Sequence, residues 1–99
     1  MTRRLVLQPE AEEDIRSARR WYERQSPGLG NEFLRAVEAS LAKVERTPEL
    51  YAAVDQATRR ARVRRFPFAV YYEIESERIV IYAVWHYRRD PTERQQRSR

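Results

Sequence analysis

The chain contains 99 residues, of which 20 are lysine or arginine and 15 are aspartate or glutamate, so its formal net charge is +5. This length predicts one domain near the small end of what can bury a self-sufficient core, and a hydrophobic content of 41% is too high for a disordered chain. The absence of cysteine excludes disulfides, a thiolate nucleophile and cysteine-based metal sites.

The first half of the chain predicts a short strand and then two helices. Residues 3–7 form a strand candidate, and this apolar run is far too short for a signal-peptide core or a membrane span, so we expect a soluble cytoplasmic protein. Pro9 suits the first position of a helix. An apolar stripe with helical spacing follows: Ala11, Ile15, Ala18 and Tyr22. The run 26–30 holds both glycines and predicts a turn, after which Asn31 is expected to cap a second helix that ends at Thr47-Pro48.

The second half changes to the two-residue period of β-strands. Between residues 60 and 64 arginines alternate with small apolar residues, which predicts a strand with one basic face. Pro67 marks a corner because proline cannot donate to a central ladder. Residues 69–74 and 78–85 are rich in β-branched and aromatic residues and predict a hairpin. The last strand is apolar on both faces, which is typical of a central strand. One of these faces is predicted to hold Ile79, Ile81, Ala83 and Trp85.

The stretch 59–91 concentrates arginines and aromatic rings around His86, the only histidine. Such clustering on a stiff sheet favours a surface that meets an anionic partner, and the planar arginine fork suits phosphate and carboxylate groups. The predicted contact residues for such a partner are Arg60, Arg62, Arg64, Tyr72, His86, Arg88 and Arg89. No glycine-rich phosphate loop and no metal-spaced cluster occurs in the sequence, so we expect no cofactor and no metal.

Simpler interpretations of the same residues stay open. A single histidine at a strand end is often a hydrogen-bonded structural residue, and alternating arginines can protect a sheet edge from aggregation. The aromatic residues Trp21, Tyr22, Tyr71 and Tyr72 favour packing over base stacking. Residues 1–91 are expected to form one domain, and the polar, basic segment 92–99 is expected to be a mobile tail.

Four segments carry a family resemblance: residues 11–22, 27–33, 65–72 and 83–91. In order and spacing they resemble the RelE/ParE toxins of type II toxin–antitoxin modules, which include the plasmid stabilisation proteins. The resemblance implies an α+β fold in the order β-α-α-β-β-β, with a helix hairpin packed on a mostly antiparallel sheet. It also implies a cognate antitoxin, usually encoded next door, whose extended or helical segment wraps the toxin.

The superfamily includes inhibitors of DNA gyrase and ribosome-dependent mRNA endonucleases. The turn at 27–30, the corner at 65–68 and the ending Arg89-Asp90-Pro91 look closer to the ParE branch. RNA-cleaving members typically carry a lysine-rich catalytic surface, whereas Lys43 is the only lysine here. The resemblance therefore favours a toxin that inhibits DNA gyrase by binding and needs no catalytic residues.

The alternative is an mRNA endonuclease acting on the ribosome. RNA cleavage through the 2′-hydroxyl needs a base, an acid and cations that hold the phosphorus charge. His86 could shuttle the proton, Tyr87 could stack a base or donate a proton, and Glu73 is a possible base. Arg64, Arg65 or Arg88 could clamp the phosphate. A third interpretation is a non-toxic nucleic-acid-binding module, which predicts only salt-sensitive association.

Overall fold

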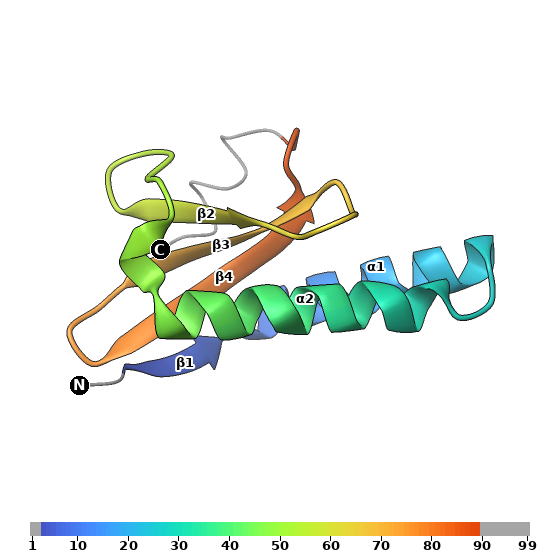
Figure 1. The fold of residues 1–99 in the computed structure, drawn as a ribbon, viewed down its shortest axis with the longest axis horizontal. Coiled ribbons are helices and arrows are strands. Elements are labelled where there is room, and N and C mark those ends of the chain that lie inside the picture. The colour runs from blue at the N-terminus through green and yellow to red at the C-terminus, as the bar shows by residue number, and fades with distance from the viewer. Residues whose placement is uncertain (1–2, 90–99) are drawn as a thin grey trace.

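The computed structural model describes residues 3–89. The elements, in chain order, are β1 (Arg4–Leu7), α1 (Pro9–Gln25), α2 (Leu29–Arg46), the 3-10 helix η1 (Pro48–Leu50), β2 (Thr58–Arg62), β3 (Phe68–Ile74) and β4 (Arg78–His86). The predicted α+β fold and the order β-α-α-β-β-β are confirmed (Figure 1). The predicted tail at 92–99, and the Asp90-Pro91 ending, lie outside the described residues.

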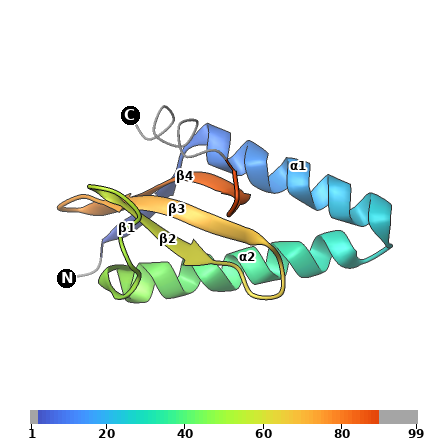
Figure 2. The same ribbon diagram turned by 90° about the horizontal axis from the view of Figure 1, so that it is seen from above.

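The four strands form one mixed sheet in the order β1-β4-β3-β2. β1 runs parallel to β4, and the β4–β3 and β3–β2 pairs are antiparallel. β4 is therefore an inner strand, as its two apolar faces predict. The helix hairpin packs along the sheet, and the end that carries its connecting turn projects beyond the strands (Figures 1 and 2).

The apolar stripes of both helices close the main core against one face of the sheet. Ala11 and Ile15 of α1 and Phe33, Val37 and Val44 of α2 are buried there. They pack against residues of the inner strands and of β2, including Val70, Tyr72, Ile79, Ile81 and Ala61. Neither helix within residues 3–89 is long and apolar enough to cross a membrane.

The prediction that Asn31 caps the second helix is wrong. α2 begins at Leu29, three residues before the start that a cap at Asn31 implies, and its N-cap Gly28 adopts a left-handed φ of 90°. The carboxylate of Glu23, near the end of α1, accepts hydrogen bonds from the backbone N–H groups of Gly28 (3.0 Å) and Gly30 (2.9 Å). A side chain from the preceding helix thus satisfies a donor in the first turn of α2, which is the role that was predicted for Asn31, and Asn31 instead accepts a hydrogen bond from Arg19.

The predicted alternation along the last strand is wrong after Ile81. Tyr71 pairs with Ala83 but Tyr72 pairs with Ile81, so Tyr82 is an extra residue in a β-bulge. Val84 consequently joins the helix-facing core, while Tyr82, Ala83 and Trp85 share the opposite cluster with Ala69 and Tyr71. The Asp14 carboxylate of α1 accepts a hydrogen bond from the Val84 N–H (3.1 Å), directly after the bulge.

The predicted basic strand is shifted toward the N-terminus. β2 starts at Thr58 and ends at Arg62, so Arg64 lies in the turn and does not share a strand face with Arg60. The Val63 N–H donates to the Phe68 carbonyl, which closes the turn, and Arg65 takes a left-handed φ of 72°. The alternating pattern of the sequence therefore continues past the end of the strand, because the residues after Arg62 form a turn.

Candidate functional site

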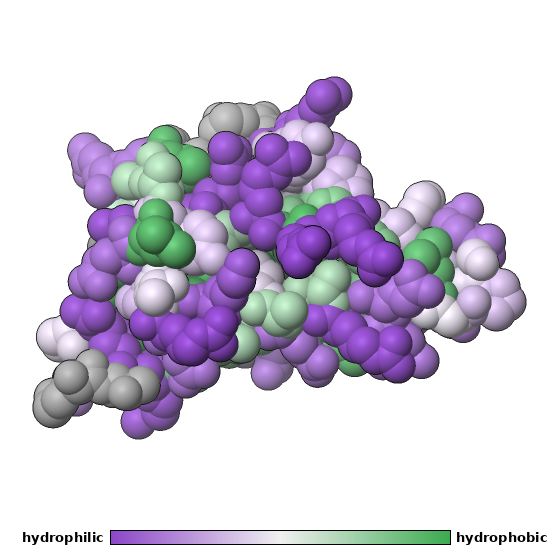
Figure 3. All heavy atoms as spheres, viewed as in Figure 1, coloured by the Kyte–Doolittle hydropathy of each residue, from purple (hydrophilic) through white to green (hydrophobic). Residues whose placement is uncertain are grey.

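A groove of about 980 Å³ runs between α2 and β2. Its α2 wall presents the small side chains Ala36, Ala39 and Ala42, and its far wall includes Tyr51 and Val54 of the segment that joins η1 to β2. We call this feature the α2–β2 groove. Figure 3 shows weakly hydrophobic surface along the middle of α2, bordered by strongly hydrophilic side chains.

The α2–β2 groove is strongly basic. Its cationic lining consists of Arg35, Lys43, Arg46, Arg60, Arg62, Arg64 and Arg65. Glu32 is the one acidic residue among the described lining residues. Because a concave, low-dielectric surface focuses the field of like charges, this groove attracts an acidic occupant.

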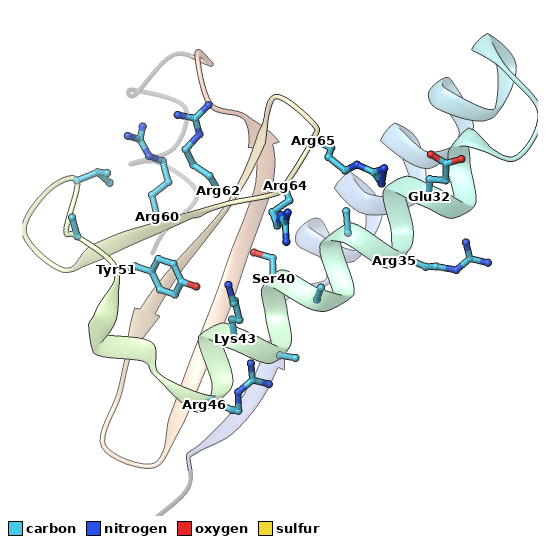
Figure 4. Close-up of a pocket in the computed structure, with 15 residues that line it drawn as sticks. Glu32, Arg35, Ser40, Lys43, Arg46, Tyr51, Arg60, Arg62, Arg64 and Arg65 are labelled. Carbon is cyan, nitrogen blue, oxygen red and sulfur yellow. The ribbon is translucent and has the colours of Figure 1, made fainter.

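The predicted arginines divide between two directions (Figure 4). Arg64 and Arg65 extend from the turn after β2 toward α2, where Arg65 points toward Glu32. Arg60 and Arg62 extend from β2 to the side away from α2. The sequence pattern predicted one arginine face, and the shifted strand end explains why there are two.

Arg62 joins a second cluster, which we call the β4 corner: Arg62, Phe68, His86, Tyr87 and Arg88. The guanidinium of Arg62 lies 4.2 Å from the centre of the Tyr87 ring, and that of Arg88 lies 5.8 Å from it. The His86 ring lies 5.2 Å from the Tyr87 ring and 6.1 Å from the Phe68 ring. These are cation–π and ring-contact distances, so the predicted His86–Tyr87 pair does meet an arginine.

Backbone hydrogen bonds fix the β4 corner. The Tyr87 N–H donates to the Pro67 carbonyl (3.1 Å), which ties the end of β4 to the turn before β3. The Arg88 N–H donates to Nδ1 of His86 (3.1 Å). Since Nδ1 accepts, the neutral imidazole carries its proton on Nε2. His86 itself is exposed, so this ring can reach a docked partner.

The other predicted residues lie away from this corner. Glu73 pairs with Thr58 and Val80, at the opposite end of β3 from Phe68, which pairs with His86. Glu73 lies five steps along β3 from Phe68, about 17 Å at the usual strand rise. Arg89 stacks on Trp85, with its guanidinium 4.0 Å from the ring centre. The structure therefore does not bring the five predicted catalytic residues together.

Tyr72 does not fit its predicted role as a partner contact. Its side chain is fully buried, and its hydroxyl donates to the Pro48 carbonyl at 2.6 Å. Burial raises the pKa of Tyr72 to about 12, so the hydroxyl stays a donor at neutral pH. The residue holds η1 against the sheet and cannot touch a partner in this conformation.

Sequence reasoning missed the α2 wall of the groove. Alanines at 36, 39 and 42 recur every three residues, and Arg35, Lys43 and Arg46 flank them. Small residues at helical spacing beside cations were the available signal. The stronger apolar stripe on the buried side of α2 obscures it. Among the described residues no three potential metal-ligating side chains gather into one group.

Together, the compact fold, the basic groove and the exposed β4 corner define a small protein built to dock on other macromolecules. The chain matches the family "ParE toxin of type II toxin-antitoxin system, parDE" over residues 5–91, and it belongs to that family. No curated protein sequence matches the chain.

Solved structures agree on the fold. The chromosomal ParDE toxin–antitoxin system from P. aeruginosa superposes with a TM-score of 0.66 at 15% identity, covering 86% of this chain and 96% of that one. The RelBE2 toxin–antitoxin complex from Mycobacterium tuberculosis gives a TM-score of 0.60 at 18% identity, covering 87% of this chain and 99% of that one. These two likenesses show a shared fold, and the family match over residues 5–91 is what makes the chain a ParE-type toxin.

Proposed function

We propose that this toxin arrests growth in the bacterial cytoplasm by binding DNA gyrase and that it does not cleave nucleic acid. The dispersal of the predicted catalytic residues carries the proposal. Glu73 lies about five strand residues from the position opposite His86, and Arg64 and Arg65 point toward α2. Chemistry on RNA needs base, acid and phosphate clamp all within reach of one scissile phosphate and its 2′-hydroxyl, whereas binding needs only an exposed surface. The family match to ParE toxins supports the same choice.

The proposal predicts how single changes in the β4 corner affect toxicity. His86→Ala is expected to keep most of the toxicity, because inhibition by binding does not need the proton of one imidazole. Arg88→Ala is expected to weaken toxicity, because it removes an exposed cation from the docking surface. Growth inhibition after induction in bacteria measures both. Complete loss of toxicity in His86→Ala alone would instead favour a nuclease.

The target is tested directly with purified components. Gyrase supercoiling and the integrity of message on translating ribosomes are measured in parallel with the wild-type toxin. Inhibited supercoiling with intact message is the expected result. Cleaved message with unaffected supercoiling would overturn the proposal.

We also propose that a cognate antitoxin neutralises the toxin by occupying the α2–β2 groove. Seven cationic residues line the groove, Ala36, Ala39 and Ala42 form its α2 wall, and Glu32 is the one acidic residue among the described lining residues. An acidic amphipathic segment fits this arrangement, because its apolar side meets the alanines while its carboxylates meet the arginines. Both structural neighbours come from toxin–antitoxin systems, ParDE in one case and RelBE2 in the other, which supports such a partner.

A second function is favoured by one observation, the stacked Arg62–Tyr87–His86 group. A ring between a guanidinium and an imidazole is a suitable platform for an unstacked RNA base beside a phosphate. This arrangement supports ribosome-dependent mRNA cleavage as the competing activity. The parallel assay of supercoiling and message integrity separates the two functions.

A further inference from the structure

Trp21 is an exposed aromatic side chain on the helix hairpin, and it does not belong to the hydrophobic core. Its side chain is 51% exposed, and among the described residues the only other large hydrophobic side chain with high exposure is Leu50 at 73%. Trp21 lies in the last turns of α1, and the turn that follows α1 is at the end of the hairpin that projects beyond the strands (Figures 1 and 2). The neighbouring Tyr22 turns toward the core, where its ring meets Phe33, Phe66 and Phe68, whereas Trp21 does not join that cluster.

The direction of Trp21 follows from its neighbours on α1. Arg19 and Glu23 both contact α2, through Asn31 and through the N–H groups of Gly28 and Gly30. Each is two residues from Trp21, which is about 200° around a helix. The indole therefore points away from α2, on the stripe that also includes Asp14 and Ser17 at the spacing of helical neighbours. The α2–β2 groove lies along α2, so Trp21 is outside it.

The charge around Trp21 is positive. The nearby carboxylates are engaged within the hairpin: Glu13 pairs with Arg16 and Arg20, and Glu23 binds the backbone of the connecting turn. Arg24 follows Trp21 by three residues, so it lies beside the indole on the helix surface. An exposed tryptophan flanked by arginine has the composition of a binding hot spot.

Other aromatic side chains hold the Trp21 ring in a fixed position. The Trp21 ring meets Tyr22 edge-on at 5.0 Å, and Tyr22 packs on Phe33 at 5.2 Å and Phe66 at 4.9 Å. An aromatic side chain braced in this way loses little conformational entropy on binding. The same face of α1 contacts β4 through Asp14 and Val84, so Trp21 lies on the side of the hairpin that leads to the end of β4.

From these observations we propose that Trp21 anchors the toxin to its target protein, on a surface separate from the antitoxin groove. The partner surface has an apolar socket for the indole and an acidic rim that faces Arg24. This inference rests on the proposed function, because it assumes that the toxin acts by binding a protein. It adds the last turns of α1 to a target-binding surface that includes the β4 corner, and it leaves antitoxin binding to the α2–β2 groove.

The test compares Trp21→Ala with the matched control Leu50→Ala, which removes the other exposed apolar side chain far from the hairpin turn. Gyrase affinity of Trp21→Ala is expected to fall roughly thirtyfold or more, the loss typical of a hot-spot residue. Trp21→Phe is expected to be intermediate because it keeps the edge contact with Tyr22. Leu50→Ala is expected to behave as wild type. All variants are expected to bind the antitoxin unchanged, which also shows that they are folded.

Two outcomes would overturn the inference. One is full growth inhibition by Trp21→Ala in bacteria, a readout that does not depend on which molecule is the target. The other is an equal loss of antitoxin binding, which would place Trp21 in that interface or in the fold. If the wild type arrests growth without affecting gyrase, the proposed function fails. The growth assay of Trp21→Ala then still decides whether Trp21 is the anchor.

Discussion

Two tyrosines in adjacent positions of β3 have different environments although their sequence context does not distinguish them. Tyr72 faces the helices and donates to the Pro48 carbonyl, while Tyr71 lies in the cluster on the opposite face of the sheet. Alternation along a strand produces this difference. An aromatic pair beside arginines can suggest a binding surface, but only the strand register and the packing on each face show whether either ring is exposed. Neither ring is exposed in this fold.

Tyr72→Phe tests the structural role of the buried hydroxyl. The change leaves the buried Pro48 carbonyl without its donor, and a buried acceptor without a partner costs about 1–2 kcal/mol of folding free energy. Thermal unfolding should therefore occur at a lower temperature, by roughly 4–8 °C per kcal/mol for a domain of this size. Antitoxin binding and growth inhibition are expected to persist at temperatures where the variant is folded. Loss of partner binding without any change in unfolding temperature would show that the Tyr72 hydroxyl contacts a partner.

The helix hairpin shows how one carboxylate can set the boundary of an element. Glu23 is exposed, yet its two hydrogen bonds to Gly28 and Gly30 start α2 at Leu29. Gly30 allows the two helices to approach closely, because a Cβ there would lie 2.8 Å from the Arg19 carbonyl oxygen. The turn is therefore a close contact between α1 and α2 in addition to a chain reversal.

Glu23→Gln is expected to destabilise the protein in a pH-dependent way. Hydrogen bonds from Gly28 and then Gly30 lower the pKa of Glu23 from its usual 4.5. A lowered pKa in the folded state means that the ionised carboxylate stabilises the fold fully above pH 4.5, and that this contribution is lost as the pH falls through the lower value. Wild type should therefore unfold at a higher temperature than Glu23→Gln at pH 7, and the difference should disappear in acid.

Thermal unfolding monitored by circular dichroism at several pH values measures this difference. Glu38→Gln, an exposed carboxylate on α2 away from the turn, serves as the control and is expected to change little. A difference between wild type and Glu23→Gln that stays constant down to acid pH would show that the charge of Glu23 does not stabilise the turn.

The type of each element was predictable from the sequence, because the spacing of the hydrophobic residues and the positions of proline and glycine indicate the same helices and strands. Pro9 begins α1, the glycine-containing run separates the helices, and the apolar residues of β4 make it an inner strand. The bulge at Tyr82 and the start of α2 were not predictable, because each depends on a residue from another element. Asp14 binds the N–H just after the bulge, and Glu23 binds the turn. The α2–β2 groove was missed for a similar reason, since two segments far apart in the sequence form its walls.

At the scale of the whole molecule, the docking features lie on different flanks of the hairpin. The α2–β2 groove follows α2, whereas Trp21 points away from α2 at the projecting end. A partner in the groove therefore need not displace a partner on Trp21 directly. Antitoxin and target could compete through overlap of larger surfaces, or the antitoxin could bind a toxin that already holds its target. Variants that block one surface alone can separate these cases.

Ala39→Trp is designed to block the groove alone. Ala39 is an exposed lining residue on α2, so an indole there fills space in the groove without entering the core. Antitoxin affinity is expected to fall at least roughly thirtyfold, because a helix could no longer approach the α2 surface. Growth inhibition should persist and should resist co-expressed antitoxin. Glu38→Trp adds the same side chain one position away, about 100° around α2 and outside the groove lining, and should remain neutralised. Titration calorimetry with purified antitoxin measures both affinities, and an Ala39→Trp toxin that binds antitoxin as tightly as wild type would show that the groove is not the antitoxin site.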